Sequence, residues 1–332
     1  MAFPQKRIGI VGAGLMGSRI GARIAAGDMP WFELAGVTDV DAARAAEVAE
    51  SLHTDAFDTQ ESLMASGVDC LYIATPDDLH REPAVTAAKA GVPFLLEKPL
   101  ATTVTDAEAI VSVVRASGTL AEVNFSNRWN PPYVAAKAEI DAGRLGAFRT
   151  LSVRLNNTLA SPTANLAWAA RTTPAWFLMS HCLDLAYWLH GLRVESVYAS
   201  GTRGVLEAKG VDTWDSIRTV VRYDNGTDGH FEALWILPEG EPGPVDFNFR
   251  YVGNEGATTI DTSKQYITVA DDTRLANLMT LNWTPARFKA FADAIDSGVP
   301  GVPVEDGLEN THVLVAIHRS LETGTVERVS RT

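Results

Sequence analysis

The sequence predicts an α/β protein of two domains: a doubly wound parallel sheet, followed by an open, mostly antiparallel β-sheet domain with flanking helices. Three observations carry this prediction. Short apolar runs alternate with segments of helical spacing over the first half, and the second half alternates in period two. The length of 332 residues also fits about two domains. We place the boundary after residue 124, which gives domains at 1–124 and 125–332.

Five apolar runs in the first half are expected to be strands. The helical segments between them show recognisable ends: the helix of residues 83–90 stops at Gly91, and Thr105 opens a capping-box pattern before 110–114. Alternating strands and helices with short connections indicate a parallel sheet covered on both faces. The expected strands lie at 8–11, 34–38, 70–74, 94–96 and 120–125.

The second half predicts hairpins rather than crossovers. Residues 148–156 and 216–223 alternate in period two, and turn signals stand at 224–226 and 253–256. Such hairpins build an antiparallel or mixed sheet. Helical patterns flank it, and they lie at 133–142, 176–189, 285–297 and 305–323.

Composition excludes several function classes. With 28 Lys and Arg against 41 Asp and Glu, the net charge of −13 repels a phosphate backbone, so we expect no nucleic-acid partner. Cys70 and Cys182 are too few for a disulfide scaffold or a cysteine-ligated zinc, and no other metal site is expected. No apolar stretch approaches the ~18 residues that span a bilayer. We therefore expect a cytoplasmic protein with no membrane partner.

A G-x-G-x-x-G sequence at residues 12–17 directly follows the first expected strand and opens a helix. Gly12 permits a tight turn, Gly14 lets the backbone approach a pyrophosphate, and Gly17 lets the helix pack closely on the sheet. The helix N-terminus offers N–H groups to the phosphates. Asp39 ends the next strand, where a carboxylate binds the ribose diol and repels the extra phosphate of NADP. NAD is thus the expected cofactor, in preference to NADP.

Further candidate residues follow the expected strands at 70–74 and 94–96, because open α/β sheets bind ligands beyond the carboxyl ends of their strands. Beside a cationic cofactor ring the pKa of Lys98 should fall, which suits this lysine to hydrogen bonding or proton transfer with a substrate hydroxyl. The cofactor-binding residues that we expect are Gly12, Ala13, Gly14, Leu15, Met16, Gly17, Asp39, Thr75, Pro76, His80, Glu97 and Lys98.

Together these motifs resemble those of the glucose–fructose oxidoreductase/inositol dehydrogenase (Gfo/Idh/MocA) family. The resemblance implies a Rossmann domain, NAD(P)-dependent oxidation or reduction of a sugar, cyclitol or related polyol, and a homodimer or homotetramer joined through the C-terminal sheet. It runs in order over nearly the whole chain, and it rests on residues 12–17, Asp39, 74–76, 97–100, 125–131, 143–146, 181–185 and 305–307.

The resemblance also implies roles for single residues. Lys98 is the lysine of its E-K-P motif, and His181 matches the histidine that acts as acid/base on the reacting hydroxyl. Asp184 lies three residues on, on the same helix face, and either orients His181 or contacts the substrate. Arg128 matches a position that often faces the sugar. With Trp168, these residues form the expected substrate-binding set.

One departure from the family pattern concerns Phe177. Many members carry an aspartate there, four residues before the histidine, which completes a Lys–Asp–His set. Three interpretations stay open: Asp184 replaces the missing acid, the enzyme uses Lys98 and His181 alone, or the hydride chemistry is weak or lost.

The leading interpretation is an NAD-dependent dehydrogenase of a secondary alcohol. Hydride passes between a ring carbon and nicotinamide C4 while His181 takes the hydroxyl proton and Lys98 holds the oxygen. The Phe177 departure motivates one alternative, an NAD-binding regulatory protein without turnover. Another is an enzyme that uses NAD transiently, oxidising and re-reducing a single substrate.

Overall fold

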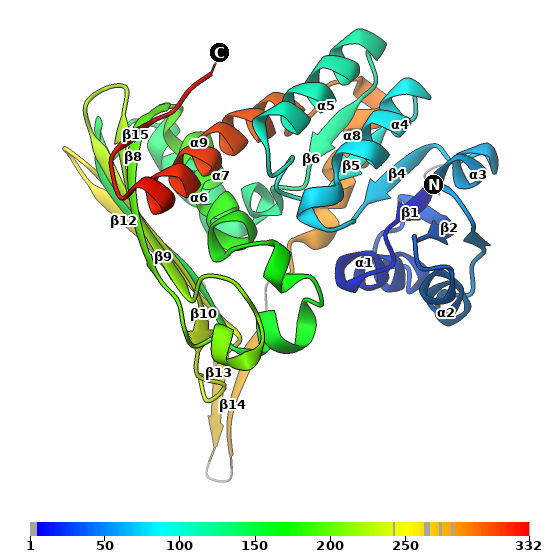
Figure 1. The fold of residues 1–332 in the computed structure, drawn as a ribbon, viewed down its shortest axis with the longest axis horizontal. Helices are drawn as coiled ribbons and strands as arrows, with labels where there is room; N and C mark the ends of the chain where they lie inside the picture. The colour runs from blue at the N-terminus through cyan, green and yellow to red at the C-terminus, as the bar shows by residue number, and fades with distance from the viewer. Residues whose placement is uncertain (1–4, 242, 262–265, 272–273, 280–281, 332) are drawn as a thin grey trace. The chain divides into compact units, whose positions relative to one another are not determined.

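The computed structural model of the chain describes residues 5–241, 243–261, 266–271, 274–279 and 282–331. It divides into two compact units (Figure 1). Unit 1 comprises Met1–Phe125 and Thr284–Thr311, and unit 2 comprises Ser126–Trp283 and His312–Thr332. This division differs from the expected domains in two respects, because Phe125 and residues 284–311 lie with the first unit.

Unit 1 contains a six-stranded sheet in the order β3-β2-β1-β4-β5-β6, and every neighbouring pair is parallel. This confirms the predicted doubly wound sheet. Its strands are β1 (Lys6–Val11), β2 (Phe32–Thr38), β3 (Ala56–Phe57), β4 (Cys70–Ile73), β5 (Phe94–Leu96) and β6 (Ala121–Val123). The sequence did not indicate β3, since two residues are too short to show a period.

Some helices of unit 1 show clear side-chain caps. Asp41 accepts from the backbone N–H groups of the first turn of α2, and Thr103 accepts from Asp106 N at 3.1 Å at the start of α5. The expected cap at Thr105 is therefore wrong by two residues. Thr103 has the same spacing to Asp106 as Thr105 has to Glu108. The helices are α1 (Leu15–Ala25), α2 (Ala42–Leu52), α3 (Gln60–Ala65), α4 (Arg81–Lys89), α5 (Val104–Ser117) and α8 (Thr284–Ser297).

Helix α8 joins unit 1 because its apolar face covers the parallel sheet. Phe288 is fully buried, and its ring lies edge-on to Phe32 of β2 and Tyr72 of β4, with centroids 6.0 and 5.5 Å apart. Phe291 stacks on Phe32. A parallel sheet needs cover on both faces, and a segment close to the C-terminus supplies part of it.

Unit 2 contains a seven-stranded mixed sheet in the order β12-β11-β7-β10-β9-β8-β15. The pair β7–β10 is parallel, and the other neighbouring pairs are antiparallel, which confirms the predicted sheet class. Its strands are β7 (Phe148–Thr158), β8 (Val194–Thr202), β9 (Ser216–Tyr223), β10 (Asp228–Leu237), β11 (Val245–Gly253), β12 (Ala257–Asp261) and β15 (Glu327–Arg328). A separate hairpin pairs β13 (Tyr266–Asp271) with β14 (Arg274–Met279).

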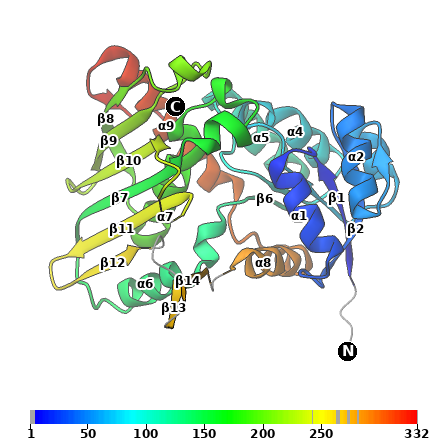
Figure 2. The ribbon, with the colours of Figure 1, turned by 90° about the horizontal axis from the view of Figure 1, so that it is seen from below.

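One face of this sheet packs against helices α6 (Pro131–Asp141) and α7 (Ser180–His190) (Figure 2). A π-helical turn at Ala175–Met179 precedes α7, within the segment where the sequence predicted regular helix from residue 176. Turns of this kind recur at functional sites, and this one ends two residues before His181. Among the described residues, no helix has both the length and the apolarity required to cross a membrane.

Candidate functional site

The glycine turn between β1 and α1 has the geometry of a phosphate cradle. Gly12 has φ +99°, and a Cβ there would lie 2.7 Å from Ala74 O. A Cβ at Gly17 would lie 1.8 Å from Gly12 O, so neither position accepts a side chain. A Cβ at Gly14 would meet nothing within 4 Å, which leaves open space beside the backbone.

The N-terminus of α1 is suited to an anion. Its N-cap, Gly14, provides no side-chain cap, and the first turn, which contains Leu15 and Met16, carries no acidic residue. The first N–H groups of a helix have no intrahelical partners, and they carry a partial positive charge. The turn therefore fits a dinucleotide pyrophosphate, as expected from the sequence.

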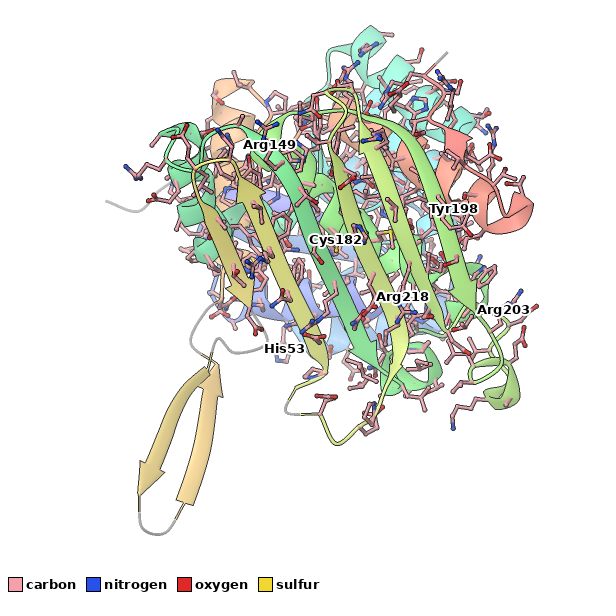
Figure 3. All side chains as sticks on the ribbon, turned by 90° about the vertical axis from the view of Figure 1, so that its left-hand side faces the viewer. His53, Arg149, Cys182, Tyr198, Arg203 and Arg218 are labelled. Carbon is pink, nitrogen blue, oxygen red and sulfur yellow. The ribbon has the colours of Figure 1, made fainter. Side chains whose placement is uncertain are left out.

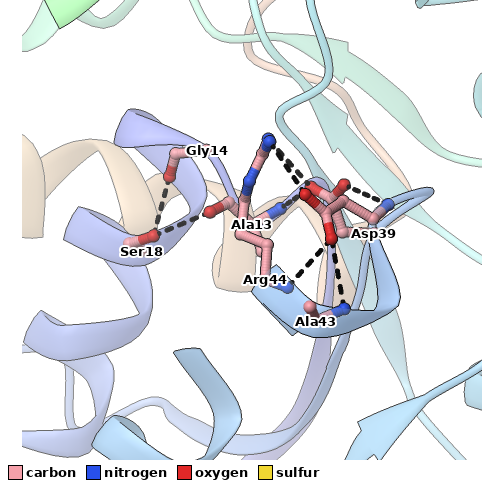
Figure 4. A network of polar contacts seen from close by, with 7 residues as sticks. Ala13, Gly14, Ser18, Asp39, Ala43 and Arg44 are labelled. Carbon is pink, nitrogen blue, oxygen red and sulfur yellow. Dashed lines mark hydrogen bonds and ion pairs between the residues drawn. The ribbon is translucent and has the colours of Figure 1, made fainter. Parts of the chain in front are cut away.

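The Asp39 carboxylate is anchored beside this turn (Figure 4). Its Oδ2 accepts from Ala13 N at 2.7 Å, and its Oδ1 accepts from Asp41 N at 2.9 Å. The Arg44 guanidinium lies near both acids, with Nη1 3.9 Å from Asp39 Oδ2 and Nη2 3.3 Å from Asp41 Oδ2. The charge at the end of β2 is thus negative, with one half-exposed arginine already paired to it.

Replacing Asp39 with Ser is expected to lower the affinity for NAD by about 10- to 100-fold, because a charge-assisted acceptor for the ribose diol is lost. The affinity for NADP should rise, since Arg44 loses one of its two carboxylate neighbours. Titration of cofactor fluorescence with NADH and NADPH measures both. Asp28→Ser, at an exposed aspartate paired with Arg23, is the control. An unchanged ratio of the two affinities in Asp39→Ser would remove Asp39 as the selector.

His80 connects the loops that follow β4 and β5. Its Nδ1 lies 2.7 Å from Pro99 O, and its Nε2 lies 3.0 Å from Thr75 O. The ring is almost completely buried. The Lys98–Pro99 peptide bond, next to the Pro99 carbonyl that His80 contacts, is cis. Both ring nitrogens of His80 therefore face backbone carbonyls, and the residue braces the two loops in which Thr75, Pro76 and Lys98 stand.

Lys98 is buried at the end of β5, with 8% of the residue exposed. Burial lowers the pKa of its ammonium from the ordinary value, whereas the carboxylates of Asp77 and Glu97 act in the opposite direction. A lysine with a lowered pKa exchanges a proton more readily near neutral pH, as proton transfer to and from a substrate hydroxyl requires.

Glu97 directs its carboxylate into the protein. Its Oε1 accepts from Asn124 Nδ2 at 2.7 Å and from the Tyr72 hydroxyl, and its Oε2 accepts from Lys98 N at 3.3 Å. No sequence motif marked Tyr72 or Asn124. Asn124 directly follows β6, so its place at a strand end was the available signal.

In unit 2, Arg128 and Asp184 form a buried ion pair. Arg128 Nε donates to Asp184 Oδ2 at 3.1 Å, and Nη2 donates to Oδ1 at 2.5 Å. Their side chains are 7% and 2% exposed. Arg128 comes from the 3-10 turn Ser126–Trp129, and Asp184 lies on α7. The structure thus gives Asp184 a guanidinium partner that the sequence analysis did not anticipate.

His181 is partly exposed in the first turn of α7. Phe177, on the π-helical turn before it, lies between two tryptophans: its ring centroid is 6.1 Å from Trp168 and 5.6 Å from Trp235, both edge-on. The side chain at the position of the family's aspartate is therefore part of an aromatic cluster. Trp168, expected to contact substrate, belongs to the same cluster.

No group of three or more His, Cys, Asp or Glu side chains that could hold a metal ion is found in the part of the chain that the structure describes.

Two family models match the chain. Residues 6–125 match "Oxidoreductase family, NAD-binding Rossmann fold", and residues 133–259 match the "GFO/IDH/MocA C-terminal domain". The first description agrees with the glycine turn and with Asp39, and it confirms NAD as the expected cofactor class.

The relatives are inositol and sugar dehydrogenases. The chain is 28% identical over 273 residues to scyllo-inositol 2-dehydrogenase (NAD(+)) of Bacillus subtilis, covering 80% of this chain and 77% of that protein. It is 31% identical over 263 residues to levoglucosan dehydrogenase of Pseudarthrobacter phenanthrenivorans, covering 68% and 66%. Scyllo-inositol dehydrogenase from Lactobacillus casei, solved with NAD(H) and scyllo-inositol, superposes with a TM-score of 0.83 at 21% identity, covering 98% and 99%. This last likeness concerns the fold.

Proposed function

The chain belongs to the Gfo/Idh/MocA family of NAD-binding oxidoreductases, and we propose that it oxidises a secondary alcohol of a cyclitol or sugar. It is an NAD-dependent oxidoreductase. The observation that carries the proposed reaction is Lys98, a buried lysine of lowered pKa at the carboxyl end of β5, in the same unit as the glycine turn. The names of the relatives support a polyol as the substrate class.

The residues of unit 1 fit the dinucleotide. The open space at Gly14 and the uncapped N-terminus of α1 suit its pyrophosphate, and Asp39 suits the adenosine ribose. Bound NAD supplies the carbon that accepts hydride from the substrate.

In this proposal Lys98 and His181 have different roles at the substrate hydroxyl. The C–H bond of the alcohol gives up its hydrogen as hydride, and the O–H bond gives up its proton to His181, so that a carbonyl forms. The Lys98 ammonium donates a hydrogen bond to the same oxygen and stabilises the negative charge that develops on it. The Arg128–Asp184 pair holds α7 near its first turns and contributes to the substrate pocket together with Trp168.

We also propose a cytoplasmic homodimer or homotetramer joined through the sheet of unit 2. Figure 3 shows the face of this sheet opposite to α6 and α7. Charged pairs such as Arg218–Glu232 lie on it, and Tyr198 is a large apolar side chain that is 45% exposed. Such a face suits a second copy of the chain.

The test of the reaction is a substrate panel. The purified protein is incubated with NAD or NADP and a set of inositols, anhydrosugars and aldoses, and the absorbance of reduced nicotinamide is followed. We expect turnover with NAD on one class of cyclitol or sugar. A rise in the absorbance of reduced nicotinamide only with substrates that are not polyols would overturn the proposal.

Phe177 favours a second candidate, a protein that binds NAD without turnover, because an aromatic cluster occupies the position of the family's acid. Tight NADH binding, silence across the panel and no altered product would support it. Product formation without net reduced nicotinamide would instead indicate an enzyme that uses NAD transiently.

A further inference from the structure

We propose that Tyr72, Asn124 and Arg287 are positioning residues for Lys98, and that they act by holding the carboxylate of Glu97. The inference rests on the proposed role of Lys98 in the reaction. All these residues lie in unit 1, although they come from β4, β5, the end of β6 and α8.

The Glu97 carboxylate is surrounded by hydrogen-bond donors. Its Oε1 receives two side-chain donors, the Tyr72 hydroxyl and Asn124 Nδ2, and its Oε2 receives the backbone N–H of Lys98. Glu97 and Asn124 are 7% and 6% exposed, and Tyr72 is fully buried. These donors satisfy a carboxylate that is buried directly beside Lys98.

The side-chain amide of Asn124 is oriented by Arg287. Arg287 Nε donates to Asn124 Oδ1 at 3.2 Å. A guanidinium has donors only, so the amide must turn its oxygen toward Arg287 and its NH2 group toward Glu97. Arg287 thereby determines that Asn124 donates to Glu97 instead of presenting an oxygen to it.

The Arg287 guanidinium is itself held by buried acceptors. Its Nη1 donates to Glu122 Oε2 at 2.6 Å and its Nη2 to Val123 O at 3.3 Å. Both Arg287 and Glu122 are fully buried, and Gly301 N donates to the other oxygen of Glu122. The guanidinium is therefore fixed on three sides, and its Nε is aimed at Asn124.

These contacts form one chain of hydrogen bonds from α8 to the residue before Lys98. Glu97, the last residue of this chain, has two effects on Lys98. Its Oε2 accepts a hydrogen bond from Lys98 N, and its carboxylate opposes the lowering of the Lys98 pKa that burial causes. Such outer partners fix the orientation and proton affinity of the groups that touch substrate.

The test compares two buried tyrosines. Tyr72→Phe removes a hydroxyl that donates to Glu97, whereas Tyr223→Phe removes a buried hydroxyl for which the described residues provide no hydrogen-bond partner. Arg287→Lys keeps a positive charge beside Glu122. The lysine ammonium lacks the planar set of donors with which arginine bonds Glu122 and Asn124 at once. Thermal unfolding and NADH binding are recorded for every variant.

The readout that does not depend on turnover is the pH dependence of labelling of Lys98 by acetic anhydride, followed by mass spectrometry, with exposed Lys209 as the internal reference. In Tyr72→Phe the Glu97 carboxylate loses a donor that holds it in place beside Lys98, so its attraction for the Lys98 ammonium weakens. The labelling midpoint of Lys98 should move to lower pH by about one unit, and kcat should fall by about tenfold with little change in NADH binding. Arg287→Lys should shift both in the same direction by a smaller amount.

Identical labelling curves and kcat values for Tyr72→Phe and Tyr223→Phe would overturn the proposal and leave the network a purely structural role. If Tyr72→Phe does not fold, the labelling curve and kcat of Arg287→Lys are compared with those of Tyr223→Phe instead, and identical values again overturn the proposal. A shifted labelling curve in a protein that oxidises no polyol would retain the network and reject the proposed reaction, so the two failures are distinguishable.

Discussion

Replacing Lys98 with Met is expected to lower kcat by about a thousandfold, while the Kd for NADH changes by less than about threefold. Methionine has nearly the length of lysine and suits a site that is 8% exposed, so the substitution removes the ammonium without opening a cavity. In the proposed reaction, the substitution removes the donor that stabilises the negative charge on the substrate oxygen. We expect cofactor binding to depend mainly on the glycine turn and Asp39.

Steady-state kinetics on the substrate found in the panel, together with NADH fluorescence, measure the two quantities. Lys209→Met, at an exposed lysine on the other unit, is the matched control. Rates like those of the wild type in Lys98→Met would remove Lys98 from the mechanism, and with it the positioning role of Tyr72, Asn124 and Arg287.

Replacing Asp184 with Asn is expected to lower the free energy of unfolding by about 3–5 kcal/mol, because it removes the carboxylate charge that is paired with the buried Arg128 guanidinium. Both side chains are less than a tenth exposed and are joined by two hydrogen bonds. The double variant Arg128→Met/Asp184→Asn should recover most of the loss, since the buried guanidinium charge is then removed together with the carboxylate charge.

Urea unfolding followed by circular dichroism measures these changes. Asp293→Asn, which breaks the exposed Lys289–Asp293 pair, should leave the transition unchanged. If Asp184→Asn unfolds like the wild type, or the double variant is no better than the single one, the pair does not stabilise α7. A rise in substrate KM in the recovered double variant would assign the pair a part in substrate binding.

The sequence was sufficient wherever the determining residues are neighbours along the chain. The strand, the tight turn and the helix N-terminus that form the phosphate cradle are consecutive, and the positive φ of Gly12 and the close approach of Gly17 to Gly12 O lie within this segment. Asp39 ends the next strand in order. The parallel sheet and the mixed sheet were predicted for the same reason, because period and connection length are local properties.

Local patterns left errors of a few residues. Thr103 and Thr105 carry the same spacing to an acid, and the structure uses Thr103 as the cap of α5. The helix predicted from residue 176 begins with a π-helical turn, so regular helix starts at Ser180. Packing against the sheet decides between such alternatives, and it is not visible in a short window.

The partners of charged and aromatic side chains were decided by the tertiary structure. Arg128 is 56 residues from Asp184, and Arg287 is 165 residues from Glu122. Phe177 marks a departure in the sequence, but only the fold shows that its ring lies between Trp168 and Trp235. The sequence by itself determined the fold class, the cofactor turn and the identity of Lys98 and His181 as candidates. Which groups hold Glu97 and Asp184 depends on strands and helices that meet only after folding, because a buried charge takes its partner from whatever element packs beside it.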